Sequence, residues 1–311
     1  MDIRIDPEYA RLASLVVTPG EKIGEDGRQP SYDAQLDEIT GYRPPEGLDI
    51  ADRMIPGING APDVRIRVYR NPGAREAPLL VNIHGGGFFA GGLGRDDHRC
   101  AAFALGVPCT VVSVQYRLAP ETVYPGQLED CLAAVRWAHE NGAEIGIDPS
   151  RIALLGSSAG GCIAAGLCLY IRDKGGPKIA MQILNFPSLD CAATTVSCHQ
   201  LYANAPFVKV KGLHAVWKSY LGDFDGADPP YYAVPALARN LADLPPALVV
   251  TCEYDPLRDE GIEYARRLME NAVPTELYSL PRVPHAFDHV PAAMTAWIRE
   301  GMFRSLRREF G

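Results

Sequence analysis

A serine flanked by glycines is the strongest chemical signal in the sequence. Residues 156–160 read Gly-Ser-Ser-Ala-Gly, which matches the pattern G-x-S-x-G with Ser158 at its centre. The motif follows the apolar segment 152–155 and opens a segment rich in Ala, Leu and Cys. In such a strand–turn–helix setting, a sharp turn lifts the serine hydroxyl to the edge of a sheet and strains its backbone. The pattern predicts that Ser158 is a nucleophile, and a glycine-rich turn without chemistry is the alternative.

An acid and a histidine follow two later predicted strands. Asp255 comes after residues 247–252, and His285 comes after residues 275–280. Because parallel strands gather their functional groups at one edge of a sheet, both side chains are expected near Ser158. A serine hydroxyl attacks well when an imidazole takes its proton and a buried carboxylate orients that imidazole. We therefore predict a catalytic triad of Ser158, His285 and Asp255.

Two neighbouring residues offer rival interpretations. Asp259 is another acid near the same strand end, but its place at the start of a predicted helix is typical of an N-cap. His289 lies four residues after His285 and could share a metal ion with it. Prolines at 284 and 291 bracket this segment and no third ligand cluster is evident, so no metal is expected. Because His285 must be neutral to act as a base, activity should fall below roughly pH 6.5.

A run of three glycines could stabilise the negative charge that develops on the substrate during the reaction. Residues 84–88 read His-Gly-Gly-Gly-Phe and come directly after the apolar segment 79–83. Successive amides in such a loop can point into one concavity, where they bind the oxyanion of an acyl-transfer intermediate. Gly85 and Gly86 would supply two donors, and Ala159 a third.

The same glycines fit a competing motif. Residues 85–90 match the dinucleotide fingerprint G-x-G-x-x-G/A, which would make the protein an oxidoreductase. That motif requires an acid at the end of the next strand, and residues 111–117 contain none. No good helix begins at Gly87 either. We therefore expect no nucleotide and no other cofactor.

The segments that carry these residues alternate between short strands and helices. Strands are predicted at residues 64–69, 79–84, 110–116, 151–155, 179–185, 247–252 and 275–280. Helices are predicted at residues 9–17, 32–42, 127–141 and 259–271, with a further helical, aromatic stretch within 191–230. This alternation predicts an α/β fold, with a mostly parallel sheet that helices cover on both faces.

The composition excludes several classes of protein. The chain has 311 residues with 47% hydrophobic and 22% charged side chains, which is ordinary for a globular protein. A net charge of −8 argues against nucleic acid as a partner. Residues 152–171 carry no charge, but the small residues at their centre argue against a membrane span. Eight sparse cysteines and a start without a basic, apolar leader indicate reduced thiols and a cytoplasmic location.

Several motifs together resemble the hormone-sensitive-lipase-like branch of the α/β-hydrolases. The resemblance runs from about Val64 to the C-terminus. The motifs lie at residues 84–88, 116–121, 129–130, 148–152, 156–161, 255–260 and 285–287. The resemblance implies an α/β-hydrolase fold, with Ser158 as nucleophile, His285 as base and Asp255 as its orienting acid. It also assigns Gly85, Gly86 and Ala159 to the oxyanion hole.

The resemblance also implies a helical cap over the site. Residues 1–50 would form its N-terminal part and residues 191–230 an inserted part, while residues 51–190 and 231–311 form the catalytic domain. Two departures from the family pattern stand out. Position 157 is Ser where the family often has Asp or Thr, and residues 282–284 read Arg-Val-Pro where a glycine-containing turn is usual.

The sequence therefore predicts a serine hydrolase that cleaves carboxylic esters through an acyl-enzyme on Ser158. The resemblance suggests short to medium acyl chains. Four aromatic residues could narrow the substrate pocket or belong to the core, and they are Phe88, Phe89, Tyr202 and Phe207. A non-catalytic small-molecule receptor on the same fold is the alternative from another class, and amidase or lactonase activity is the alternative among hydrolases. We expect a small-molecule ester as substrate, a homodimer by base rate, and no stable membrane insertion.

Overall fold

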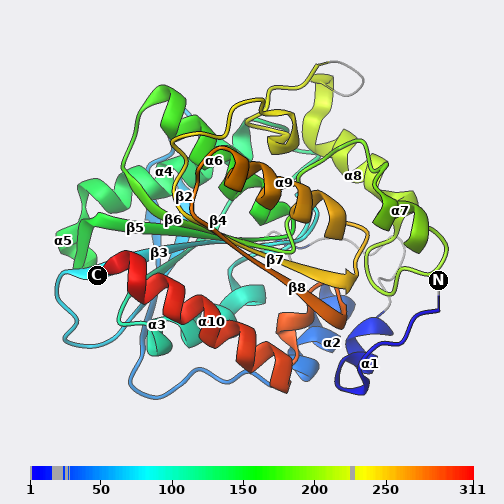
Figure 1. The fold of residues 1–311 in the computed structure, drawn as a ribbon. Coiled ribbons are helices and arrows are strands. Elements are labelled where there is room, and N and C mark those ends of the chain that lie inside the picture. Colours follow the sequence, from blue (N-terminus) through cyan, green and yellow to red (C-terminus); the bar gives the residue numbers. More distant parts are fainter. Residues whose placement is uncertain (1, 16–23, 25–26, 28, 225–227) are drawn as a thin grey trace.

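One eight-stranded sheet organises the molecule (Figure 1). The computed structural model describes residues 2–15, 24, 27, 29–224 and 228–311. The order of the strands across the sheet is β1-β2-β4-β3-β5-β6-β7-β8. Their bounds are β1 Asp49–Ile55, β2 Val64–Arg70, β3 Ala77–Ile83, β4 Thr110–Gln115, β5 Ile147–Ser157, β6 Ile179–Asn185, β7 Ala247–Tyr254 and β8 Thr275–Pro284.

Six of these strands, β3 to β8, run parallel to one another. The strand β2 pairs with β4 in the antiparallel sense, and β1 pairs with β2 in the same way. The prediction of a mostly parallel sheet within an α/β-hydrolase fold is therefore confirmed. The β1 strand was not predicted, because it lies at the exposed edge of the sheet and Ile55 is its one buried residue. An edge strand of this kind lacks the apolar alternation by which strands are recognised.

Helices cover both faces of the sheet. The longer ones are α2 Pro30–Thr40, α3 Asp97–Gly106, α4 Gly126–Glu140, α6 Ala159–Lys174, α8 Val210–Leu221, α9 Arg258–Glu270 and α10 Ala293–Phe310. The shorter ones are α1 Ala10–Ala13, α5 Gly142–Ile145 and α7 Val196–Leu201, with 3₁₀ turns η1 Pro7–Tyr9, η2 Leu93–Asp96, η3 Gly222–Phe224, η4 Pro235–Leu237 and η5 Phe287–His289. In Figure 1, α4, α6 and α9 lie on one face, and α3 and α10 lie on the other. The buried apolar side chains form one large cluster on each face.

The helices α3 and α10 were missed, although α10 carries a clear signal. Its buried residues Ile298, Met302, Leu306 and Phe310 recur every four positions, which is the spacing of one helix face.

The predicted helix at residues 9–17 is shorter in the structure, where η1 and α1 cover residues 7–13 and residues 16 and 17 lie outside the described part. The predicted helix at 32–42 begins two residues earlier, at Pro30. Proline suits this first position because it has no amide hydrogen to leave unpaired.

The uncharged stretch at residues 152–171 divides into two buried elements. It comprises the end of β5 and most of α6, and almost every side chain in it is buried by the sheet or by neighbouring helices. Along the ranges that the structure describes, no helix has both the length and the apolar character needed to cross a membrane.

Four parallel strands end at the same edge of the sheet and carry the predicted site residues there. The glycine loop follows β3, Ser158 follows β5, Asp255 follows β7 and His285 follows β8. Phe186 directly follows the strand β6, which lies between β5 and β7, at the same edge. Residues far apart in the chain therefore meet because their strands are neighbours or near neighbours in the sheet.

Candidate active site

Ser158 occupies a strained turn between β5 and α6. Its backbone angles are φ 56° and ψ −119°, a conformation that non-glycine residues rarely adopt. The turn is tight enough that a Cβ on Gly156 would lie 2.2 Å from the carbonyl oxygen of Gly160. A Cβ on Gly160 would in turn lie 2.1 Å from the carbonyl oxygen of Ile83. Both glycines of the motif are therefore required by close backbone approach.

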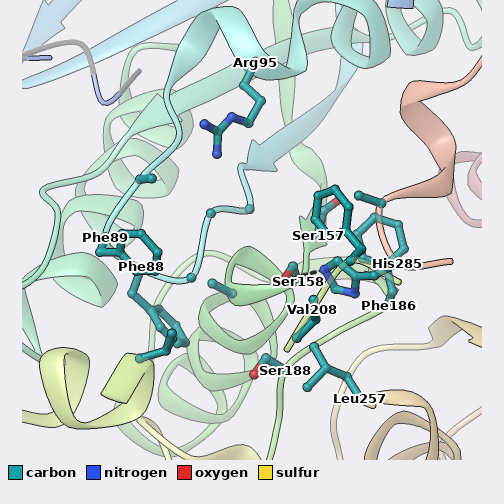
Figure 2. A pocket seen from close by; sticks show the side chains of 18 of the residues that line it. Phe88, Phe89, Arg95, Ser157, Ser158, Phe186, Ser188, Val208, Leu257 and His285 are labelled. Atoms are coloured by element: carbon teal, nitrogen blue, oxygen red, sulfur yellow. Dashed lines mark hydrogen bonds between the residues drawn. The ribbon is translucent and has the colours of Figure 1, made fainter. Parts of the chain in front are cut away.

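His285 lies between the serine and the acid. Its Nε2 lies 2.9 Å from Oγ of Ser158, and this hydrogen bond is the dashed line in Figure 2. Its Nδ1 lies 2.6 Å from Oδ2 of Asp255. With the proton on Nδ1, the imidazole donates to the carboxylate and Nε2 accepts from the serine hydroxyl. The structure thus brings together the three residues of the predicted triad.

Asp255 is held in place as well as buried. The residue is 0% exposed, and its second oxygen, Oδ1, accepts the backbone N–H of Leu257 at 3.0 Å. One oxygen is therefore fixed by the start of α9, which leaves the other directed at His285. A carboxylate in this position selects the imidazole tautomer that can accept a proton at Nε2.

The glycine loop and the start of α6 face the same cavity as Ser158. Gly85, Gly86 and Ala159 all line it. Among the described residues, no turn or loop hydrogen bond uses the backbone N–H of any of the three. Ala159 is the first residue of α6, so its amide also has no partner within the helix. The three donors that the sequence predicted for an oxyanion are thus available at this place.

Two aromatic rings hold the imidazole. The ring of Phe207 stacks on His285 at a centroid distance of 5.8 Å, and the ring of Phe186 meets it edge-on at 4.7 Å. Phe186 was not predicted as a site residue. Its position directly after β6, between two strands that carry triad residues, is the signal that could have identified it.

The cavity beside Ser158 has a volume of about 290 Å³. Of the four predicted pocket residues, Phe88, Phe89 and Phe207 line it. The prediction for Tyr202 is wrong, since this residue lies outside the cavity with 54% of its surface exposed. Its ring instead contacts the ammonium group of Lys211 at 5.6 Å. Tyr202 follows the last residue of α7, and its side chain projects to solvent rather than toward the sheet edge.

The helix-capping interpretation of Asp259 is also wrong. The residue before α9 is Leu257, and its side chain makes no capping hydrogen bond. Asp259 instead accepts the backbone N–H of Ser197 at 2.6 Å and pairs with Arg258 at 2.7 Å. Ser197 is in the first turn of α7, so Asp259 caps a different helix from the one it belongs to.

A buried ionic cluster lies behind the loop that carries His285, and it was not predicted from the sequence. Arg99 on α3 pairs with Asp96 and with Asp288, at 2.6 Å in each case. Asp288 also accepts from the side-chain amide of Asn185, the last residue of β6. The cluster therefore joins the histidine loop to α3 and to the end of β6.

His289 belongs to the same region and has a histidine neighbour. Its ring lies 4.7 Å from the ring of His98, and burial is the main cause that lowers its pKa well below the ordinary value. Within the described ranges, no group of three or more His, Cys, Asp or Glu side chains is arranged to hold a metal ion.

The geometry defines a protein with a serine–histidine–aspartate site at the carboxyl edge of a mostly parallel sheet. The family model described as alpha/beta hydrolase fold matches residues 80–289. The chain belongs to this family, which confirms its resemblance to the hormone-sensitive-lipase-like branch.

Named relatives and solved structures agree with this assignment. The chain is 41% identical to Esterase LipI of Mycobacterium tuberculosis over 80% of this chain and 79% of that protein. It is 40% identical to Carboxylesterase NlhH of the same species, over 81% of this chain and 82% of that protein. Among solved structures, a bacterial heroin esterase is similar with a TM-score of 0.89 and 36% identity, over 99% of this chain and 98% of that one.

Proposed function

We propose that this protein hydrolyses carboxylic esters with short to medium acyl chains, through an acyl-enzyme formed on Ser158. The observation that carries the proposal is the continuous hydrogen-bond chain from Asp255 through His285 to Ser158, with distances of 2.6 Å and 2.9 Å. The class of activity is that of an ester hydrolase of the carboxylesterase type, because the similar proteins and structures reported above are named esterases.

The first half-reaction forms the acyl-enzyme. Oγ of Ser158 attacks the ester carbonyl carbon while its proton passes to Nε2 of His285. The carbonyl oxygen becomes negatively charged and accepts hydrogen bonds from the backbone N–H groups of Gly85, Gly86 and Ala159. The intermediate then collapses, the bond to the alcohol oxygen breaks, and the alcohol leaves with the proton from His285. Asp255 stabilises the imidazolium throughout.

The second half-reaction uses water in place of serine. His285 takes a proton from the water as its oxygen attacks the acyl carbon, and the same amides hold the second oxyanion. When the bond to Ser158 breaks, Nε2 returns the proton to the serine, and the carboxylic acid is released.

The cavity volume of about 290 Å³ supports a preference for small acyl groups, because it is at the low end for ligand sites.

Replacing Ser158 tests the proposal directly. Ser158→Ala removes the attacking oxygen, and we expect kcat for 4-nitrophenyl butyrate to fall on the order of a millionfold. Ser157→Ala is the matched control, because it removes a hydroxyl one position away that does not contact His285, and its kcat should stay within about tenfold of wild type. A phosphonate ester should label the wild type and fail to label Ser158→Ala.

Two outcomes would contradict the proposal. Undiminished ester cleavage by Ser158→Ala would show that another group is the nucleophile. Binding of an ester without an acyl-enzyme burst would favour the non-catalytic receptor.

We also propose a homodimer and a cytoplasmic location. The strand β8 lies at the edge of the sheet, and Trp297 on the adjacent α10 is 55% exposed. An edge strand with an exposed aromatic beside it supports pairing with a second copy, which sedimentation would measure. The buried cysteines at positions 100, 109, 131, 162, 168, 198 and 252 are free thiols, which supports a reducing compartment.

A further inference from the structure

One end of the active-site cavity carries a buried arginine whose hydrogen-bonding capacity is only partly used. Arg95, in η2, has 8% of its side chain exposed, and it lines the cavity. Its Nε donates to Asp33 at 3.0 Å, and its Nη2 donates to the same carboxylate at 3.2 Å. Among the described residues, no hydrogen bond engages its remaining nitrogen, Nη1. A buried guanidinium normally uses all its donors, since an unpaired one costs free energy.

The unpaired nitrogen lies beside the predicted oxyanion hole. Nη1 would be 3.0 Å from a Cβ built on Gly86, so it lies next to the glycine loop. Figure 2 shows the guanidinium directed into the hollow above Ser158, on the opposite side from Ser188 and Leu257. A substrate whose scissile carbonyl sits at the glycine loop therefore has Nη1 as a neighbour.

The guanidinium is fixed before any substrate arrives. Asp33, on α2, is 1% exposed and holds two of its nitrogens. The ring of Tyr32 lies under it at 5.2 Å in a cation–π contact. A donor held on two sides loses little conformational entropy when it binds, so it can discriminate between substrates of similar size.

The charges around Arg95 favour a neutral acceptor. Asp33 already neutralises Arg95, and Asp96, which lines the same cavity, is paired with Arg99. Asp288 contributes a further carboxylate to Arg99. Both guanidinium groups are thus already paired with carboxylates, and the ammonium of Lys209, which also lines the cavity, donates to the backbone carbonyl of Ala205. A carbonyl oxygen can accept from Nη1 without bringing a charge into this end of the cavity.

We propose that Arg95 is a specificity-determining residue that recognises an uncharged second carbonyl oxygen in the substrate, through a hydrogen bond from Nη1. The preferred substrates are then esters that carry a keto or second ester carbonyl in addition to the scissile one. This inference rests on the proposed ester hydrolysis and deepens it, because it names the substrate class of the same site.

Matched pairs of esters test the inference on the wild-type protein. On the acyl side, 4-nitrophenyl 4-oxopentanoate is compared with 4-nitrophenyl 4-methylpentanoate, in which a methyl group replaces the keto oxygen. On the alcohol side, 2-oxopropyl butyrate is compared with 2-methylpropyl butyrate. We expect kcat/KM to favour the keto ester by about tenfold or more in at least one pair, the effect of one hydrogen bond from a charged donor. No preference in either pair would overturn the inference.

A carboxylate substrate tests the charge argument. The 4-nitrophenyl monoester of succinic acid has nearly the shape of the 4-oxopentanoate but carries a negative charge. We expect it to react more slowly than the keto ester. A preference for the succinate over the keto ester would overturn the assignment to a neutral acceptor.

A pair of variants assigns the effect to Arg95. Arg95→Met alone would leave the buried carboxylate of Asp33 unpaired, so the test compares Asp33→Asn/Arg95→Met with Asp33→Asn. The ratio of kcat/KM for the keto ester over its matched ester should stay high in Asp33→Asn. In the double variant this ratio should fall to about one. An unchanged preference in the double variant would overturn the role of Arg95.

The outcomes separate this inference from the proposed function. If the wild type cleaves butyrate esters but does not distinguish the members of either pair, the inference fails and the proposed function stands. If it cleaves no ester at all, the proposed function fails. Should the variants not fold, the wild-type comparison still decides the substrate class.

Discussion

At the scale of single residues, the strained backbone of Ser158 is held by hydrogen bonds from two segments. Its N–H donates to the carbonyl oxygen of Asn185 at 3.0 Å, and its own carbonyl oxygen accepts from the N–H of Ser188 at 3.1 Å. Both partners belong to the end of β6 and the loop that follows it. A positive φ at a non-glycine residue costs about 1–3 kcal/mol, and bonds of this kind keep such a conformation populated.

The orienting role proposed for Asp255 leads to a prediction at the same scale. Asp255→Asn keeps the size of the side chain but replaces the negative oxygen opposite Nδ1 of His285 with an amide. Because the amide no longer selects the productive tautomer or stabilises the imidazolium, we expect kcat to fall by about 10⁴ with little change in KM. Steady-state hydrolysis of 4-nitrophenyl butyrate measures both constants.

Asp259→Asn provides the matched control for this substitution. It makes the same chemical change four residues further along the chain, where the carboxylate contacts Ser197 and Arg258 and not His285. Its kcat should remain within about threefold of wild type. Equal losses in the two variants would mean that the orienting role has been assigned to the wrong acid.

At the scale of elements, Phe207 joins two segments that are distant in the sequence. Its ring stacks on His285, and the ring of Tyr32 on α2 meets it edge-on at a centroid distance of 6.2 Å. The N-terminal segment and the segment between β6 and β7 therefore meet directly over the imidazole of His285. This contact supports the proposal that both segments form a cap, and it makes Phe207 a wall of the cavity.

Removing this wall should change the acyl-chain preference. Phe207→Ala leaves space that additional methylene groups can fill, and each buried methylene contributes about 0.8 kcal/mol. We expect the ratio of kcat/KM for the octanoate over the butyrate 4-nitrophenyl ester to rise by roughly threefold to tenfold. A series of 4-nitrophenyl esters from acetate to decanoate measures this ratio.

The matched control for Phe207→Ala is Tyr202→Ala. It also removes a large aromatic ring from the same inserted segment, but that ring is exposed and lies outside the cavity. Its chain-length profile should match that of the wild type. If Phe207→Ala gave the wild-type profile too, the acyl group would have to bind elsewhere in the cavity.

At the scale of the whole molecule, buried histidines couple stability to pH. His84 is 0% exposed, its ring stacks on Tyr116 at 4.0 Å, and burial lowers its pKa to about 4. The pKa of His289 is lowered as well, also chiefly by burial. An unfolded chain binds protons at these side chains near pH 6.5, whereas the native protein does so only in more acid solution. The unfolded state therefore holds more protons between about pH 6.5 and 4, so the free energy of unfolding decreases as pH falls through this window.

This coupling predicts a measurable change in slope. Each such histidine contributes up to about 1.4 kcal/mol per pH unit in this range. His84→Gln cannot take up a proton, so its free energy of unfolding should depend less steeply on pH between 6.5 and 4.5 than that of the wild type. Urea denaturation at several pH values measures this slope. The difference in the free energy of unfolding between wild type and variant at pH 7.5 separately reports the packing lost with the imidazole. Identical slopes would mean that His84 titrates alike in both states.

The sequence was sufficient for features that local chemistry dictates. The apolar segments that became β3, β6 and β7 were recognised because a strand buried on both faces must be apolar along its length. The motif around Ser158 was recognised because the close approach at Gly156 and Gly160 leaves no space for a Cβ. By contrast, β1 was missed because an exposed edge strand can be polar throughout.

The amino-acid sequence by itself determined the order of the strands β2 to β8 along the chain, the turn at Ser158 and the identity of the three residues of the predicted triad. Those choices depend on the chemistry of each residue and of its near neighbours in the chain. Tertiary structure alone decided that Tyr202 faces solvent, that Asp259 caps α7, and that Arg95 is paired with Asp33 while one of its nitrogens faces the cavity. These outcomes depend on which segments pack together. The same aromatic or charged side chain can line a cavity, cap a helix or face solvent, and its neighbours in the folded protein decide which.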